Sequence, residues 1–147
     1  MAQSTTAAKP ALKITRTYAA PREKVFRAWT DPEVMKKWFA PSDEFSVPEV
    51  AIDARVGGRY CIVMRAPDGE HHRVGGVYRE YAPPARLVFT WAWESTPERE
   101  SLVTVEFKEL GTSTELILTH ERFADEEARD KHQQGWTGCL GRLAQVL

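Results

Sequence analysis

The chain has 147 residues, of which 42% are apolar and 28% charged, and its net charge at pH 7 is −1. A chain of this length predicts one domain with a sizeable core, because a domain of about 150 residues buries roughly 70% of the surface that its unfolded chain exposes. The near-zero net charge argues against a general nucleic-acid or membrane-surface binder, and no apolar run approaches the roughly 18 residues of a membrane-spanning helix.

The first residues are small and polar, which predicts a disordered tail over residues 1–9 and a single domain over 10–147. The N-terminus lacks the basic start and apolar stretch of a secretory signal. Cys61 and Cys139 form no CxxC pair and are too few for a disulfide scaffold. We therefore expect two free thiols and a cytoplasmic location.

A strand and two short helices are predicted at the start of the domain. Leu12 and Ile14 indicate the strand. The segment Pro21–Trp29 has one apolar face and a proline suited to the first helical turn. Asp31 is a suitable cap for the second helix, with Pro32 at its first position.

From Val47 to Glu121 the apolar residues recur at every second position, as in half-buried strands. Turn residues divide this segment into about six strands with short links, which favours an antiparallel meander. The glycine pairs Gly57-Gly58 and Gly75-Gly76 predict turns or bulges that curve the sheet. The clearest one-sided stripe consists of Leu87, Phe89, Trp91 and Trp93.

The last segment predicts a long helix that begins at Asp125. Its apolar stripe, at spacings of three and four, consists of Ala128, His132, Trp136, Leu140, Leu143 and Leu147. Gly135, Gly138 and Gly141 recur at every third position of this helix. Gly138 and Gly141 lie off the apolar stripe, and they either allow another element to approach closely or soften the helix end. The predicted fold class is α+β: a curved antiparallel sheet of about six to seven strands around this helix, with two short helices after the first strand.

The usual motifs of metal, nucleotide and nucleophile sites are missing from the sequence. His71 and His72 are adjacent on a predicted strand, so they point to opposite faces and cannot chelate one ion together. The sequence has no zinc-ligand spacing, no phosphate-binding glycine loop and no GxSxG motif. We therefore expect no metal, no cofactor and no catalytic residue.

His120 is the main candidate for a polar site residue, because it continues the predicted inward face of Leu116 and Leu118. It is either a core histidine bonded to a backbone carbonyl or a polar group that orients a ligand. An enzymatic alternative pairs His120 with Glu106 as acid and base, although Glu106 should face away from the core. The aromatic stripe has two interpretations as well: it fills the core under a flat sheet, or lines a pocket under a strongly curved one.

Four segments together resemble a known family: ITRTYAAPREKVFRAWTDPEVMKKWFAP, ARVGGRYCIVM, APPARLVFTWAWE and GWTGCLGRL. They are similar to the SRPBCC superfamily and, within it, to the group related to the C-terminal domain of the heat-shock-protein-90 ATPase activator. The resemblance covers the chain from about Leu12 to Leu147. It implies a helix-grip fold, in which the sheet wraps the C-terminal helix, and a deep apolar cavity between the two.

With this resemblance, the sequence predicts non-enzymatic binding of a hydrophobic small molecule. The alternatives are a cochaperone-like partner module acting on heat-shock protein 90, and an enzyme that uses the same cavity. We expect no nucleic-acid or membrane partner, and either a monomer or a homodimer. The predicted ligand-binding residues are Trp38, Tyr60, Ile62, Met64, Phe89, Trp91, Val105, Leu118, His120, Trp136 and Leu140.

Overall fold

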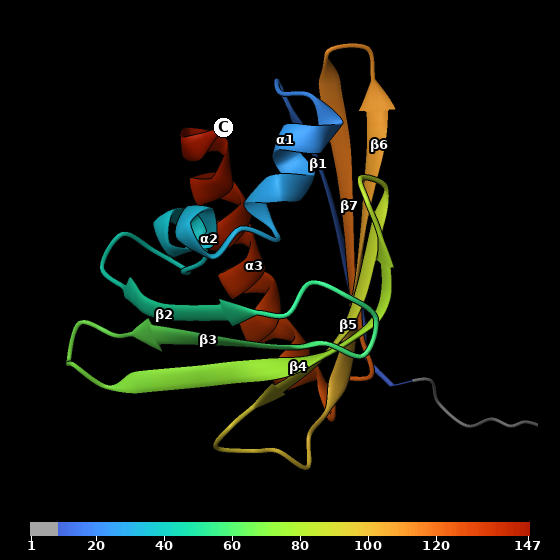
Figure 1. Cartoon of the computed structure of the whole chain (residues 1–147). Helices are drawn as coiled ribbons and strands as arrows, with labels where there is room; N and C mark the ends of the chain where they lie inside the picture. The colour runs from blue at the N-terminus through green and yellow to red at the C-terminus, as the bar shows by residue number, and fades with distance from the viewer. Residues whose placement is uncertain (1–8) are drawn as a thin grey trace, which may run out of the picture.

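The computed structural model describes residues 9–147, so the predicted tail lies outside the described residues except for Lys9. The elements follow in the predicted order of strand, two short helices, strands and a long helix (Figure 1). Their bounds are β1 (Leu12–Tyr18), α1 (Arg22–Ala28), α2 (Pro32–Trp38), β2 (Ser46–Ile52), β3 (Arg59–Arg65), β4 (His71–Ala82), β5 (Arg86–Trp93), β6 (Ser101–Leu110), β7 (Ser113–Glu121) and α3 (Glu126–Val146).

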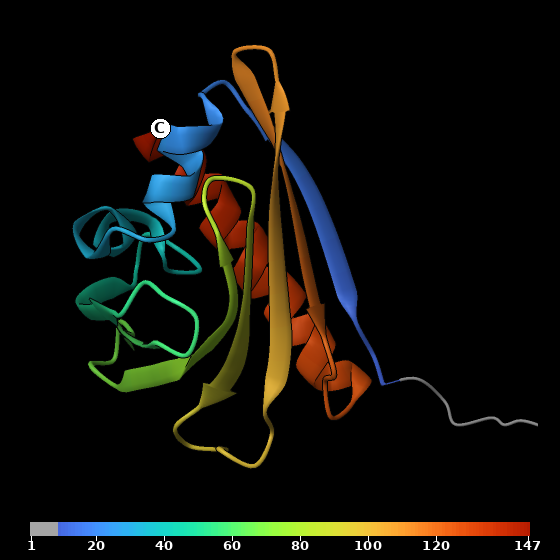
Figure 2. The ribbon, with the colours of Figure 1, turned by 45° about the vertical axis from the view of Figure 1, so that its right-hand side comes forward.

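The strands form one seven-stranded sheet in the order β1-β7-β6-β5-β4-β3-β2, and each neighbouring pair is antiparallel. Strands β1, β7 and β6 stand roughly upright in Figure 1, whereas β2, β3 and β4 run roughly horizontally at the lower left. After a 45° turn, α1 and α2 lie to the left of the upright strands, and α3 runs diagonally behind β5 and β6 (Figure 2). The predicted α+β class and the curved antiparallel sheet around a long C-terminal helix are confirmed.

The strand register puts the predicted apolar stripes on the concave face. Val103 pairs with His120 and Val105 with Leu118, so alternate residues of β6 and β7 face α3 together. On β5, Leu87, Phe89 and Trp91 are buried and Trp93 is half-buried. The period-two pattern therefore identified the inward face of the sheet correctly.

Two helix starts carry the predicted caps. The Asp31 carboxylate accepts a hydrogen bond from the backbone N–H of Glu33 at 2.9 Å. The Asp125 carboxylate accepts one from the backbone N–H of Ala128 at 2.8 Å. Pro21 lies one position before the first helical residue of α1 rather than inside its first turn, which is a small correction.

One glycine pair lies in a turn, and the other lies where two strands approach each other closely. Neither pair lies at the irregularity in strand pairing. Gly57 has φ of +82° in the turn between β2 and β3. A Cβ at Gly76 would lie 2.0 Å from the backbone oxygen of Thr90 on β5, so only glycine fits there. The register shift between β4 and β5 falls between Tyr78 and Glu80. Gly75-Gly76 is therefore not the bulge that the sequence suggested.

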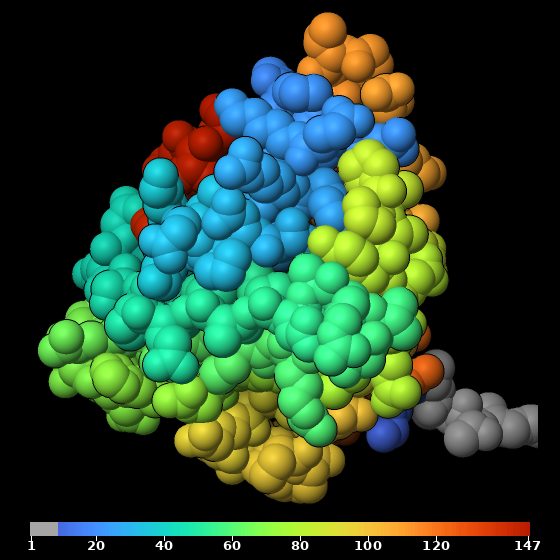
Figure 3. Space-filling model, viewed as in Figure 1, coloured from blue at the N-terminus to red at the C-terminus, as the bar shows by residue number. Residues whose placement is uncertain are grey.

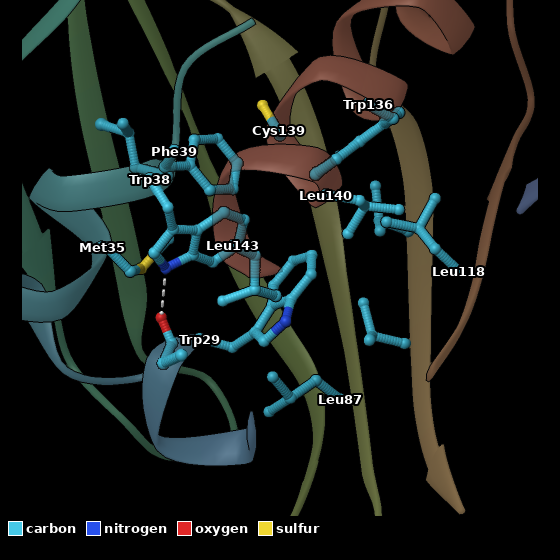
Figure 4. Close-up of a cluster of buried hydrophobic side chains, with 14 of the residues drawn as sticks. Trp29, Met35, Trp38, Phe39, Leu87, Leu118, Trp136, Cys139, Leu140 and Leu143 are labelled. Atoms are coloured by element: carbon cyan, nitrogen blue, oxygen red, sulfur yellow. Dashed lines mark hydrogen bonds between the residues drawn. The ribbon is translucent and has the colours of Figure 1, made fainter. Parts of the chain in front are cut away.

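The core lies between the sheet and the helices. Trp29 directly follows α1, Trp38 is the last residue of α2, and Phe39 follows it. In Figure 4 their side chains lie beside Leu140 and Leu143 of α3. The three aromatic residues are buried, with ring centroids of Trp29 and Trp38 4.9 Å apart. On the face drawn in Figure 3, α1, α2 and β2 lie against one another and cover most of α3. This part of the concave face is therefore filled.

Close contact between α3 and the loop after α2 requires glycine at position 138. A Cβ on Gly138 would lie 2.0 Å from the backbone oxygen of Pro41, and a backbone atom cannot move aside as a flexible side chain can. The close-approach interpretation of the helix glycines is therefore correct at this position. At Gly141 an added Cβ would meet only the Arg16 side chain, at 3.7 Å.

Gly138→Ala should lower the free energy of unfolding by about 1–3 kcal/mol, because the overpacked methyl group outweighs the gain of about 1 kcal/mol in helix propensity. Gly141→Ala is the matched control and should leave stability equal or raise it by up to about 1 kcal/mol. Urea unfolding followed by circular dichroism measures both. Equal stabilisation by the two substitutions would show that α3 is not held this closely against Pro41.

Candidate functional site

A pocket of about 890 Å³ lies where α3 begins. It is bounded by the N-terminal half of α3, the end of β5, the start of β6, the β5–β6 and β7–α3 loops, the loop after α2, and one residue each from β3 and β4. We divide its lining by burial. The floor is the buried apolar part and consists of Phe39, Met64, Trp91, Phe123, Trp136 and Cys139.

Aromatic rings in mutual contact make up most of the floor. The ring centroid of Trp136 lies 5.1 Å from that of Trp91 and 5.5 Å from that of Phe39. Phe123 reaches the pocket because the chain reverses just before it, where Arg122 adopts a left-handed φ of 71°. The large apolar area of these rings suits the binding of an apolar ligand.

The walls are half-buried and the rim is exposed. The main wall residues are Pro41, Phe45, Trp93, Ala128, His132 and Gly135. The charged residues of the rim are Arg99, Asp125, Glu127 and Lys131, and Gln134 lies beside them. The pocket thus changes from apolar at its floor to polar at its opening.

His132 connects α3 to two tryptophans of β5. Its Nε2 accepts hydrogen bonds from Trp93 Nε1 at 2.9 Å and from Trp91 Nε1 at 3.3 Å. Its Nδ1 lies 2.7 Å from the backbone oxygen of Ala128 and must donate, because a carbonyl only accepts. This pattern requires the neutral imidazole, and burial lowers the pKa of His132 below its ordinary value.

His120 lies directly behind the floor and is completely buried. Its Nδ1 accepts a hydrogen bond from Trp136 Nε1 at 3.0 Å. An indole nitrogen only donates, so the ring proton of His120 is on Nε2 and points to Ser101 Oγ, 2.7 Å away. Ser101 Oγ in turn donates to the backbone oxygen of Trp91 at 3.2 Å. Burial, and secondarily the neighbouring His132, holds the pKa of His120 well below its ordinary value.

This hydrogen-bond order has a chemical consequence. A serine nucleophile must donate its proton to a histidine nitrogen that acts as base, whereas Ser101 accepts from His120. Glu106, the acid–base partner that the sequence suggested for His120, lies on the outer face of the sheet. Its carboxylate forms an ion pair with Arg86 there, at 3.2 Å. The pairing of His120 with Glu106 that the sequence offered is therefore wrong.

The structure places the predicted ligand-binding residues in three groups. Met64, Trp91 and Trp136 lie on the pocket floor. His120 is bonded to two lining residues but does not itself line the pocket. The remainder are core residues away from it: Trp38, Tyr60, Ile62, Phe89, Val105, Leu118 and Leu140.

These residues lie away from the pocket because aromatic side chains next to α1 and α2 fill the middle of the concave face. Around Tyr60, Ile62 and Phe89, with Trp29 opposite, the remaining gap is only about 10 Å³. That is about the space of one water molecule. The cavity expected there is closed, and the open pocket lies at the start of α3 instead.

Most lining residues were not among the predicted site residues, and about half of these come from loops. Phe45 and Phe123 lie outside any regular strand or helix, so periodicity gives no signal for their direction. Trp93 and His132 did carry a signal, since each belongs to an apolar stripe that the sequence showed. The charged rim residues carried none, because they resemble ordinary surface charges.

Cys61 and Cys139 are both free, as predicted, with Cys139 buried and Cys61 half-buried. Burial raises the pKa of the Cys139 thiol to about 12. Within residues 9–147, no three His, Cys, Asp or Glu side chains are grouped so that they could hold a metal ion. Over the same residues, no helix has the length and apolarity needed to cross a bilayer.

Comparison with known proteins identifies the family. Residues 19–147 match the family described as Activator of Hsp90 ATPase homolog 1-like protein, and the chain belongs to that family. The structure of protein CV1439 from Chromobacterium violaceum is similar with a TM-score of 0.83 at 28% identity, covering 94% of this chain and 97% of that one. No match was found among the curated proteins.

Two further solved structures have the same fold. The AHSA1 protein SPO3351 from Silicibacter pomeroyi has a TM-score of 0.82 at 29% identity, with 92% of this chain and 96% of that chain covered. CalU16 from Micromonospora echinospora has a TM-score of 0.71 at 29% identity, with 92% and 74% covered. The family match and the shared fold confirm the resemblance to the SRPBCC superfamily.

Acidification from about pH 7.5 to about pH 5.5 should lower the free energy of unfolding. The pKa values of His120 and His132 lie below 6.5 in the folded protein, so below this pH the unfolded chain binds more protons than the folded one. The stabilisation is complete above about pH 6.5 and is lost progressively below it. Urea unfolding midpoints across this range measure the effect.

The matched control is the double variant His120→Asn, His132→Gln, which keeps hydrogen-bonding groups but removes both imidazoles. Its stability should depend less on pH over the same range, while the exposed His71 and His72 remain in both proteins. If the unsubstituted protein were as stable at about pH 5.5 as at about pH 7.5, or more stable, the neutral state assigned to the two histidines would be contradicted.

Proposed function

We propose that this protein binds a small, mainly apolar molecule in the pocket at the start of α3, without catalysing a reaction on it. The observation that carries the proposal is an 890 Å³ pocket with an aromatic floor. Binding sites for small molecules typically have volumes of about 300–1,000 Å³, apolar linings and a few polar groups. Membership of a family with this fold supports the same function.

The floor can supply enough free energy for useful affinity. Each Å² of apolar surface removed from water contributes about 25 cal/mol. A ligand that buries about 400 Å² of apolar surface in total would gain roughly 10 kcal/mol before the costs of association are subtracted. Association costs at the low end of the expected range, about 4 kcal/mol, would leave roughly 6 kcal/mol, which corresponds to a dissociation constant of tens of micromolar. Met64, Trp91 and Trp136 are the predicted ligand contacts that this proposal retains.

The family description also names an activator of the Hsp90 ATPase, so action on a chaperone is the alternative function. A partner module should present an apolar patch of several hundred Å². Among residues 9–147, the exposed large apolar side chains are Val56, beside the turn before β3, and Leu110, at the end of β6. These two residues lie on separate elements and give the alternative no specific support.

Gly135 provides a test of the pocket that does not depend on destabilising the protein. It lies in the pocket wall, and a Cβ built on it meets no atom within 4 Å. Gly135→Leu should therefore fill part of the pocket while raising helix propensity, with stability unchanged or up to about 1 kcal/mol higher. Binding of the neutral fluorescent probe N-phenyl-1-naphthylamine should weaken by at least about tenfold.

The measurement is a fluorescence titration of the probe into each protein, with unfolding curves recorded in parallel. Gly141→Ala, on the same helix but outside the pocket lining, is the control and should bind the probe like the unsubstituted protein. If the unsubstituted protein does not bind the probe, or Gly135→Leu binds it with unchanged affinity, the proposed function is wrong.

A further inference from the structure

The three tryptophans that line the pocket have no free hydrogen-bond donor. Trp91 and Trp93 direct their indole N–H groups to His132 Nε2, and Trp136 directs its indole N–H to His120 Nδ1. Each indole has a single donor, so these bonds use the full capacity of the three rings. A ligand therefore meets their apolar surfaces and not their N–H groups.

The histidine and serine of the same network have no free group either. His132 Nδ1 is bonded to the backbone oxygen of Ala128, and its Nε2 already accepts two bonds. Ser101 Oγ, the one hydroxyl among the buried lining residues, donates to Trp91 O and accepts from His120. The inner part of the pocket is thus built from polar side chains that are already saturated by one another.

The rim differs in polarity but carries balanced charge. Arg99 lies 3.8 Å from the Asp125 carboxylate, and Lys131 lies 3.3 Å from that of Glu127. The exposed Gln134 adds a neutral amide. Each cation at the opening has an acidic neighbour, so the rim can hydrogen-bond a ligand without favouring either sign of charge.

From this arrangement we infer the class of ligand, an inference that rests on the proposed function. The ligand is an uncharged molecule whose flat, apolar inner end has no hydrogen-bonding atom and whose polar groups lie only at its outer end. His132 is the specificity-determining residue, because it occupies two indole donors that would otherwise face the pocket. A polar atom at the inner end of a ligand loses its bonds to water and finds no partner there.

Two probes of the same shape test this inference. 4-Phenylphenol has one polar and one apolar end, whereas 4-(pyridin-4-yl)phenol has a nitrogen acceptor at the second end. Either orientation of the pyridine compound buries a polar atom. At about pH 8, where the pyridine is neutral, the unsubstituted protein should bind 4-phenylphenol roughly tenfold to hundredfold more tightly. Displacement of N-phenyl-1-naphthylamine gives both affinities.

Substitution of His132 should change this preference. His132→Phe keeps an aromatic ring but removes the acceptor, so the N–H groups of Trp91 and Trp93 become available to the pyridine nitrogen. The preference for 4-phenylphenol should shrink to within about threefold or reverse. His132→Gln retains an acceptor and should keep the original preference. His132→Leu replaces His132→Phe if circular dichroism shows that the phenylalanine variant does not fold.

The outcomes separate this inference from the proposed function. If both probes bind the unsubstituted protein equally, or if the variant without an acceptor keeps the full preference, the assignment of ligand class and of His132 is overturned while pocket binding stands. If neither probe displaces the naphthylamine, and Gly135→Leu does not affect it, the pocket itself is not a binding site.

Discussion

The constraint on which this structure depends is the concave face that a curved antiparallel sheet creates. Seven strands present one apolar face, and α3 is the long helix that covers it. One helix does not fill the whole concavity, so the remainder is either filled by other side chains or left open. Aromatic residues next to α1 and α2 fill the region beside the second half of α3 (Figure 4), and the region beside its first half stays open as the pocket.

The boundary between the filled and the open part is formed by shared side chains. Phe39 and Trp136 belong both to the core and to the pocket floor, and Trp29 stacks on Trp136 from the core side at 5.9 Å. A floor supported from behind by close-packed rings is held in position before a ligand arrives. Such preorganisation reduces the cost of ordering side chains on binding.

Burial of the polar groups at this boundary costs desolvation free energy, and their hydrogen bonds offset that cost. Two neutral histidines bind the N–H groups of three tryptophans, so that neither the imidazoles nor the indoles are left unpaired in an apolar environment. The same bonds connect β5 and β7 to α3. One network therefore fixes the position of the helix, determines the protonation state of both histidines and leaves the pocket floor without free polar groups.

The sequence by itself determined the order of elements, the inward face of each strand, the caps at Asp31 and Asp125 and the fold class, because these depend on local periodicity and on hydrogen bonds between residues close in the chain. It also indicated the tryptophan stripe and His120. Only the tertiary structure decided whether these residues line a cavity. That outcome depends on how far Trp29, Trp38 and Phe39 extend into the concavity, and on where Phe123 and the β5–β6 loop come to lie. Such distances are set by packing between segments far apart in the chain, which no local pattern records.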